Sequence, residues 1–160
     1  MVTLDFFKPE HFPELNYILD EKQLLFTATA EQALQSIKKR NDGLAHPITI
    51  LYGEKAAGFF VLDSGDDKLD MTHNKNSLLL RSLSINPQLQ GKGIGKSAML
   101  EMDNFIRENF KNCDEIVLAV NVKNTSAYEL YLKTGYEYEG KTRLGRSGPQ
   151  YLMSKTLRKF

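Results

Sequence analysis

The chain has 160 residues, enough for one hydrophobic core, and we expect residues 1–160 to form a single domain. Lys and Arg number 21 and Asp and Glu number 20, so the net charge is 21 − 20 = +1, which argues against a nucleic-acid-binding surface. The single cysteine, Cys113, excludes an intrachain disulfide and a cysteine-based zinc site, and we expect a structural rather than a catalytic thiol.

The N-terminal stretch MVTLDFFKPEHF does not have the charged and then apolar pattern of a signal peptide. No apolar run approaches the ~20 residues that a membrane helix needs. We therefore expect a soluble, cytoplasmic protein with no membrane, nucleic-acid or metal partner. The sequence leaves both a monomer and a homodimer open.

The first half of the chain is predicted to contain three strands and two helices. The expected elements are a strand over 2–7, a helix from Pro9 to about Asp20, a helix over about 30–40 that ends at Asn41-Asp42-Gly43, and a β-hairpin formed by 48–53 and 56–63. A polar loop over 63–76 follows. It carries four Asp residues that either steer a cationic ligand or are simply solvated.

The run SLLLRSLSINP, residues 77–87, is predicted to form a strand with an irregularity. Its apolar residues fall on one parity at 78 and 80 and on the other at 83 and 85. Side chains alternate between faces along a strand, so a parity change indicates an extra residue, a β-bulge near Arg81-Ser82. The alternative is a strand buried on both faces, which needs no alternation.

The second half continues with a helix over 94–110, a short strand over 115–120, a helix over 124–135 and two strands around a Gly148-Pro149 turn. Asn124 could cap the second of these helices, or Ser126 with Glu129 could form a capping box. The order of elements predicts an α/β layered fold with a mixed sheet.

The glycine-rich stretch QGKGIGKS, residues 90–97, joins the predicted strand to the predicted helix. It fails the P-loop pattern because Gln90 stands where the first glycine must be, and it fails the dinucleotide pattern because Lys96 replaces the last glycine. Backbone N–H groups in a glycine turn at a helix N-terminus still suit a pyrophosphate, with Lys92 and Lys96 beside it. The alternative is an ordinary tight turn with solvated lysines.

Two motifs together resemble the GNAT superfamily of N-acetyltransferases. The stretch from Gln90 to Gly95 resembles the family's Q/R-x-x-G-x-G/A acyl-CoA signature, LSINP resembles its L-x-V-x-P strand end, and NTSAYELYLKTGY resembles its N-x-x-A-x-x-L-Y-x-x-x-G-F motif. The resemblance is close over about 78–140. It implies a mixed, mostly antiparallel central sheet flanked by helices, with a bulged fourth strand that diverges from the fifth.

The resemblance also implies roles for particular residues. Glycine-loop amides over about 91–96 would bind the pyrophosphate of acetyl-CoA, and main-chain groups near Leu83 and Ile85 would bind its pantetheine arm. Tyr131 would be the general acid that protonates the departing thiolate; the alternative is a core tyrosine. The residues implied in cofactor binding are Leu83, Ile85, Gln90, Gly91, Lys92, Gly93, Ile94, Gly95, Lys96, Asn124 and Lys133.

The expected reaction is transfer of an acetyl group from acetyl-CoA to a primary amine, either a small molecule such as a polyamine or a peptide N-terminus. A non-catalytic acyl-CoA-binding sensor is the alternative, because 77–86 contains no carboxylate to serve as general base. A water chain, Glu129, Asp63, His46 or His73 could take that role. In the family, acceptor choice depends on regions corresponding to about 9–42 and 136–157, where the resemblance is weakest.

Overall fold

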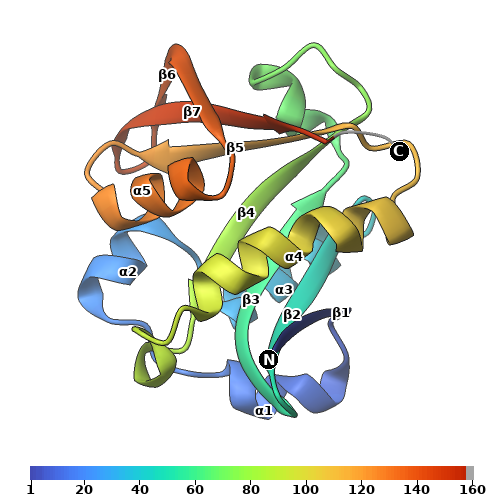
Figure 1. Ribbon diagram of the computed structural model, residues 1–160, viewed down its shortest axis with the longest axis vertical. Helices are drawn as coiled ribbons and strands as arrows, with labels where there is room; N and C mark the ends of the chain where they lie inside the picture. The colour runs from blue at the N-terminus through green and yellow to red at the C-terminus, as the bar shows by residue number, and fades with distance from the viewer. Residues whose placement is uncertain (158–160) are drawn as a thin grey trace.

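A seven-stranded sheet forms the centre of the computed structural model, and helices pack on both of its faces (Figure 1). The strand order is β1-β2-β3-β4-β5-β7-β6. Neighbouring strands are antiparallel except β4 and β5, which are parallel, so the predicted mixed and mostly antiparallel sheet is confirmed. The structure describes residues 1–157; residues 158–160, which the single-domain prediction includes, lie outside the described part.

The strands are β1 (Val2–Phe6), β2 (Ala45–Tyr52), β3 (Lys55–Asp63), β4 (Ser77–Ile85), β5 (Glu115–Asn121), β6 (Glu137–Gly145) and β7 (Gly148–Thr156). The α-helices are α1 (Phe12–Leu15), α2 (Glu21–Phe26), α3 (Ala30–Arg40), α4 (Ile94–Asn109) and α5 (Thr125–Lys133). Three short 3₁₀ turns are η1 (Pro9–His11), η2 (Asp66–Asp70) and η3 (Pro87–Leu89).

Two hydrophobic layers hold the sheet between the helices. On the near face in Figure 1, α4 buries Ala98, Met102 and Ile106 against β-strand side chains that include Phe60. On the far face, α1 and α3 pack against the opposite parity of β3, which includes Phe59. Each fully buried large apolar side chain contributes about 1.5–3 kcal/mol. The alternation along β3 therefore anchors a helix layer on each side.

The helix predicted from Pro9 to Asp20 is wrong beyond Leu15. The first part forms as η1 and α1, and Asn16, with φ −86° and ψ 44°, leaves the helical region. A separate helix, α2, begins after Asp20, whose side chain accepts a hydrogen bond from the Gln23 N–H while the Gln23 side chain accepts one from the Asp20 N–H. This capping box starts α2 inside a segment predicted to be a connection.

In the second half, one boundary differs from expectation and one open alternative is decided. The turn of the last hairpin lies at Arg146-Ser147, because Gly145 pairs with Gly148 and Pro149 already lies within β7. Asn124 is the cap of α5, since its Oδ1 accepts a hydrogen bond from the Ala127 N–H at 3.4 Å. The glycine loop and the Asn124 cap therefore lie at the N-termini of α4 and α5.

Candidate active site

The strands β4 and β5 separate after three residue pairs and leave a gap in the sheet. Pairing covers only Ser77–Leu79 of β4 and Glu115–Val117 of β5. Figure 1 shows the two strands meeting at the upper end of β4 and diverging toward the glycine loop. A cavity of about 560 Å³ occupies this open end, between the loop, α2 and α5. Its lining includes most of the residues that the sequence implicated: Leu83, Ile85, Gln90, Gly91, Gly93, Ile94, Gly95, Lys96 and Asn124.

The glycine loop forms a main-chain rim of this cavity. Gly91 has φ 82° and Gly93, the N-cap of α4, has φ 76°, a region that other residues rarely adopt. The Gln90 side chain holds the loop to the end of β4 by donating from Nε2 to the Ile85 carbonyl at 3.4 Å. Backbone N–H groups at the start of α4 are thereby available to an anion.

The end of β4 that lines the cavity has shifted in register against β3. Phe59 pairs with Ser84 and Val61 with Arg81, so a step of two residues on β3 faces a step of three on β4. Ser82 lies inside this step with a left-handed φ of 60°. The shift coincides with the parity change in the sequence. Gly58 permits it, because a Cβ there would lie 2.7 Å from the Ser84 carbonyl oxygen.

One wall of the cavity comes from α2 and the segment before it; the sequence connected about 9–42 with acceptor choice but named no residue there. Gln23, Phe26 and Thr27 line it, and Thr27 Oγ1 donates to the Leu83 carbonyl at 3.2 Å. The Tyr17 hydroxyl lies 2.7 Å from Ser84 Oγ on the same strand. Burial raises the pKa of Tyr17 to about 12, although the hydrogen bond to Ser84 acts in the opposite direction. Tyr17 is therefore protonated at neutral pH.

The predicted general acid, Tyr131, lies on α5 and is 7% exposed. Its ring meets the Tyr136 ring edge to face, with centroids 5.5 Å apart. Burial raises the pKa of Tyr131 well above its usual range, so the phenol keeps its proton. The side chain belongs to the hydrophobic core beneath the cavity and is absent from the cavity lining, as are Lys92 and Lys133, whose side chains are exposed.

The four candidate bases are not grouped at the cavity. Asp63 is fully buried, and Arg40 and Arg81 contact it at 2.7 Å and 3.3 Å. Burial alone would raise its pKa, but the hydrogen bonds from Arg40 and the Gly65 N–H outweigh this effect and lower it. Asp63 is therefore a structural anion.

The other three candidate bases do not line the cavity either. His46 packs against Phe110, Glu129 is exposed on α5, and His73 lies in the loop after η2.

Comparison with known proteins connects this geometry to a family. The model of the acetyltransferase (GNAT) family matches residues 7–136, a span that includes the glycine loop and all of α5. The chain belongs to the GNAT family. It is an acetyl-CoA-dependent N-acetyltransferase. A relative from Bacillus subtilis (strain 168), the uncharacterized N-acetyltransferase YbbJ, is 37% identical over 154 residues, which cover 95% of each chain.

Solved structures share the GNAT fold with this chain. Aminoglycoside acetyltransferase AAC(6')-Ib, in complex with paromomycin and acetyl-CoA, superimposes with a TM-score of 0.77 at 17% identity and covers 97% of this chain and 93% of its own. Spermidine N-acetyltransferase from Vibrio cholerae, in complex with CoA and spermine, gives a TM-score of 0.68 at 19% identity, with 98% and 95% covered. At these identities the likeness shows the fold alone.

Across residues 1–157, no helix is both long and apolar enough to cross a membrane. Within the same residues, no three His, Cys, Asp or Glu side chains are grouped so that they could hold a metal ion.

Proposed function

We propose that this GNAT enzyme binds acetyl-CoA in the cavity between β4 and β5 and transfers the acetyl group to a primary amine in a ternary complex. The acceptor is a small-molecule amine, such as a polyamine, or a peptide N-terminus. The observation that carries the proposal is the gap itself, where β4 residues without a β5 partner, the glycine loop and the start of α5 line one cavity of about 560 Å³.

In this proposal the acyl donor, acetyl-CoA, is bound mainly by main-chain groups of the protein. N–H groups over 91–96 bind the pyrophosphate, with help from the partial positive charge of the α4 N-terminus. Main-chain groups near Leu83 and Ile85 pair with the amides of the pantetheine arm, because β4 has no β5 partner there. Asn124 lies beside the arm, and Lys92, Lys96 and Lys133 are flanking charges.

The chemical step is attack by the neutral amine nitrogen on the thioester carbonyl carbon. A carbon–nitrogen bond forms, the carbon–sulfur bond breaks, and the sulfur leaves with its electron pair. In this proposal Tyr131, whose phenol is buried beside the cavity and does not line it, must reach the thiolate to give it its proton, and the proton lost by the amine leaves through water. A main-chain N–H near Ile85 stabilises the developing oxyanion; a donor of this kind contributes about 2.7–4 kcal/mol.

An acetyl-transfer screen tests the proposed function. The purified protein is incubated with acetyl-CoA and with polyamines, amino acids, aminoglycosides or peptides, and release of the CoA thiol is followed. We expect acceptor-dependent thiol release with at least one primary amine. Tight acetyl-CoA binding without transfer to any acceptor would instead support the acyl-CoA-binding alternative.

A further inference from the structure

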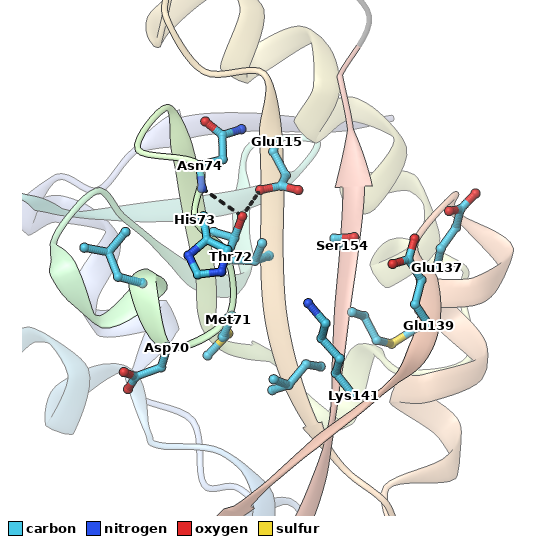
Figure 2. A pocket seen from close by; sticks show the side chains of 14 residues that line it. Asp70, Met71, Thr72, His73, Asn74, Glu115, Glu137, Glu139, Lys141 and Ser154 are labelled. Atoms are coloured by element: carbon cyan, nitrogen blue, oxygen red, sulfur yellow. Dashed lines mark hydrogen bonds between the residues drawn. The ribbon is translucent and has the colours of Figure 1, made fainter.

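A second cavity, of about 390 Å³, lies on the sheet face opposite α4 (Figure 2). Its floor is formed by β5 and β7, including Val117, Leu152 and Met153. The segment 69–74 forms one wall and the first half of β6 forms the other. The cavity therefore combines an apolar floor with walls from two segments far apart in the sequence.

Irregular backbone builds both walls. Tyr138 pairs with Met153 and Thr142 with Tyr151, so four residue steps on β6 face two on β7 and the segment 139–141 is displaced from regular pairing. Gly140, with φ 92°, lies at the centre of this segment. The opposite wall is held where Thr72 Oγ1 donates to Glu115 Oε1 at 2.7 Å. The hydrogen bond and the displaced segment fix the two walls in the folded chain.

The charge of this cavity differs from that of the whole protein. Its lining contains four carboxylates and one lysine, Lys141, which gives −4 + 1 = −3 with His73 neutral, whereas the whole chain carries +1. The carboxylates come from η2, β5 and β6 and surround the floor in Figure 2: Asp70, Glu115, Glu137 and Glu139. Among residues 1–157, none of the ion pairs includes any of these four. The cavity therefore attracts cations.

The second cavity, called the acidic cavity, lies at the paired end of the β4–β5 gap. The first cavity, where acetyl-CoA is proposed to bind, is called the donor cavity and lies at the open end. Glu115 and Val117, which line the acidic cavity, belong to the three pairs that still join β4 to β5. Leu83 is four residues along β4 from the last paired residue, Leu79, so the two ends are about 13 Å apart at ~3.3 Å per residue. A linear polyamine can span a separation of this order.

We propose that the acidic cavity is the subsite for the distal ammonium groups of a small polyamine acceptor whose terminal amine is acetylated in the β4–β5 gap. This inference rests on the proposed function. Carboxylates of the walls pair with the ammonium groups, and the floor of Val117 and Leu152 contacts the methylenes between them. A peptide N-terminus fits less well, because it has one ammonium group and its next polar atoms are carbonyl oxygens, which the carboxylates repel.

The test compares spermidine with n-propylamine as acceptors. The readout is the ratio of kcat/KM for the two amines in the parent, in Glu137→Gln/Glu139→Gln and in Lys141→Gln. The control is Glu101→Gln/Glu108→Gln, which removes two exposed carboxylates from α4. At about 0.2–1 kcal/mol for each exposed pair, the ratio should fall about 2- to 30-fold in the cavity double variant. It should rise up to about 5-fold in Lys141→Gln and stay unchanged in the control.

The proposal is overturned if the cavity and control double variants change the ratio equally, or if the parent does not prefer spermidine. Titration calorimetry of spermidine alone separates this inference from the proposed function. If another amine of the acceptor screen is acetylated but spermidine is not, this inference fails and the proposed function stands; if no acceptor is acetylated, the proposed function fails, and the calorimetry decides the cavity. Weaker spermidine binding in Glu137→Gln/Glu139→Gln supports the cavity as a polyamine site, and unchanged binding rejects it. Thermal unfolding checks that each variant is folded.

Discussion

The two cavities lie at opposite ends of the same gap between β4 and β5 and are built in different ways. The donor cavity is rimmed by main chain, with glycines at 91, 93 and 95, and its walls carry few charges. The acidic cavity is walled by side chains from η2, β5 and β6, and its net charge is −3. One end offers backbone hydrogen-bond donors, and the other offers carboxylates.

This difference indicates how one fold can bind the same acyl donor while the amine acceptor that it binds varies. Recognition by main-chain N–H groups depends on backbone shape, which many side chains leave unchanged. Recognition by carboxylates depends on individual side chains from separate segments, and single substitutions alter it. Substitutions that change one kind of recognition and leave the other intact test this difference between main chain and side chains.

The largest effect is expected at the chemical step, which in this account depends on one side chain and not on the main chain. Tyr131→Phe should lower kcat about 10²- to 10⁴-fold, because a positioned acid contributes on that scale. Acetyl-CoA affinity should be nearly unchanged, since only one hydroxyl is lost. Single-turnover kinetics measure the step, and Tyr128→Phe, a half-buried tyrosine one turn earlier on α5, is the control. An unchanged rate of chemistry in Tyr131→Phe would return Tyr131 to a purely structural role.

The next largest effect concerns the support of β4 between the cavities. Asp63→Asn should destabilise the fold by about 1.5–3 kcal/mol, because the charge-assisted hydrogen bond from Arg40 to the buried carboxylate is lost, while Arg40 and Arg81 stay partly solvated. Asp42→Asn removes an exposed carboxylate from the same Arg40 and should cost much less, because solvent screens that ion pair. Urea unfolding at pH 7 measures both values. Equal losses would show that burial of Asp63 adds nothing.

The same ion pair predicts a pH dependence. The folded-state pKa of Asp63 is lowered, so its stabilising contribution is complete above the unfolded value of about 3.9. The contribution is lost as the pH falls through the lowered folded-state pKa. The difference in unfolding free energy between the parent and Asp63→Asn should therefore be constant near neutral pH and shrink below about pH 3.9. A difference that grew on acidification would contradict this assignment.

A smaller effect tests the main-chain end directly. Gly93→Val should weaken CoA binding by about tenfold or more, because the added carbons lie where the pyrophosphate approaches. Valine at φ 76° is also strained, so Gly43→Val is the matched control: Gly43 has φ 69°, and a Cβ at either position has no atom within 4 Å. Both variants should lose similar stability, and only Gly93→Val should lose CoA affinity by calorimetry. Equal CoA binding in the two variants would show that the cradle is misplaced.

The smallest effect concerns a side chain at the same end. Lys96→Ala removes a charge at the cavity and leaves the amides in place, so CoA affinity should fall only about 1.4- to 5-fold. Lys111→Ala, an exposed lysine in the loop after α4, controls for overall charge. The two affinities should converge at high salt as the charge is screened. A loss larger than that of Gly93→Val would reverse the assignment of donor binding to the main chain.

The glycine loop could be predicted from the sequence because its determinants are consecutive. Gly91 and Gly93 stand between a strand and a helix, and their positive φ angles require glycine for the backbone alone. The parity change in β4 likewise points to the residues where the register shifts. The conformation of such motifs follows from consecutive residues, so the sequence of one segment is enough to predict where they lie.

Other parts of the site could not be predicted because they depend on distant segments. α2 was missed, since its capping box at Asp20 and Gln23 lies where a predicted helix ended and a connection was expected, and the contact of Thr27 with Leu83 joins residues 56 positions apart. The acidic cavity joins Asp70, Glu115 and Glu137 through sheet pairing that no local pattern encodes. The Asp residues at 63–70 were considered together, yet Asp63 is buried by Arg40 whereas Asp70 lines the cavity.

A crystal structure with a conjugate of spermidine and CoA, joined through an acetyl bridge at the sulfur, tests the central claim that the two cavities serve one reaction. We predict that the pyrophosphate contacts amides over 91–96, that the bridge lies beside Leu83 and Ile85, and that the distal ammonium groups lie among Glu115, Glu137 and Glu139. A pyrophosphate bound away from the glycine loop, or a spermidine chain that leaves the gap by another route, would contradict the account.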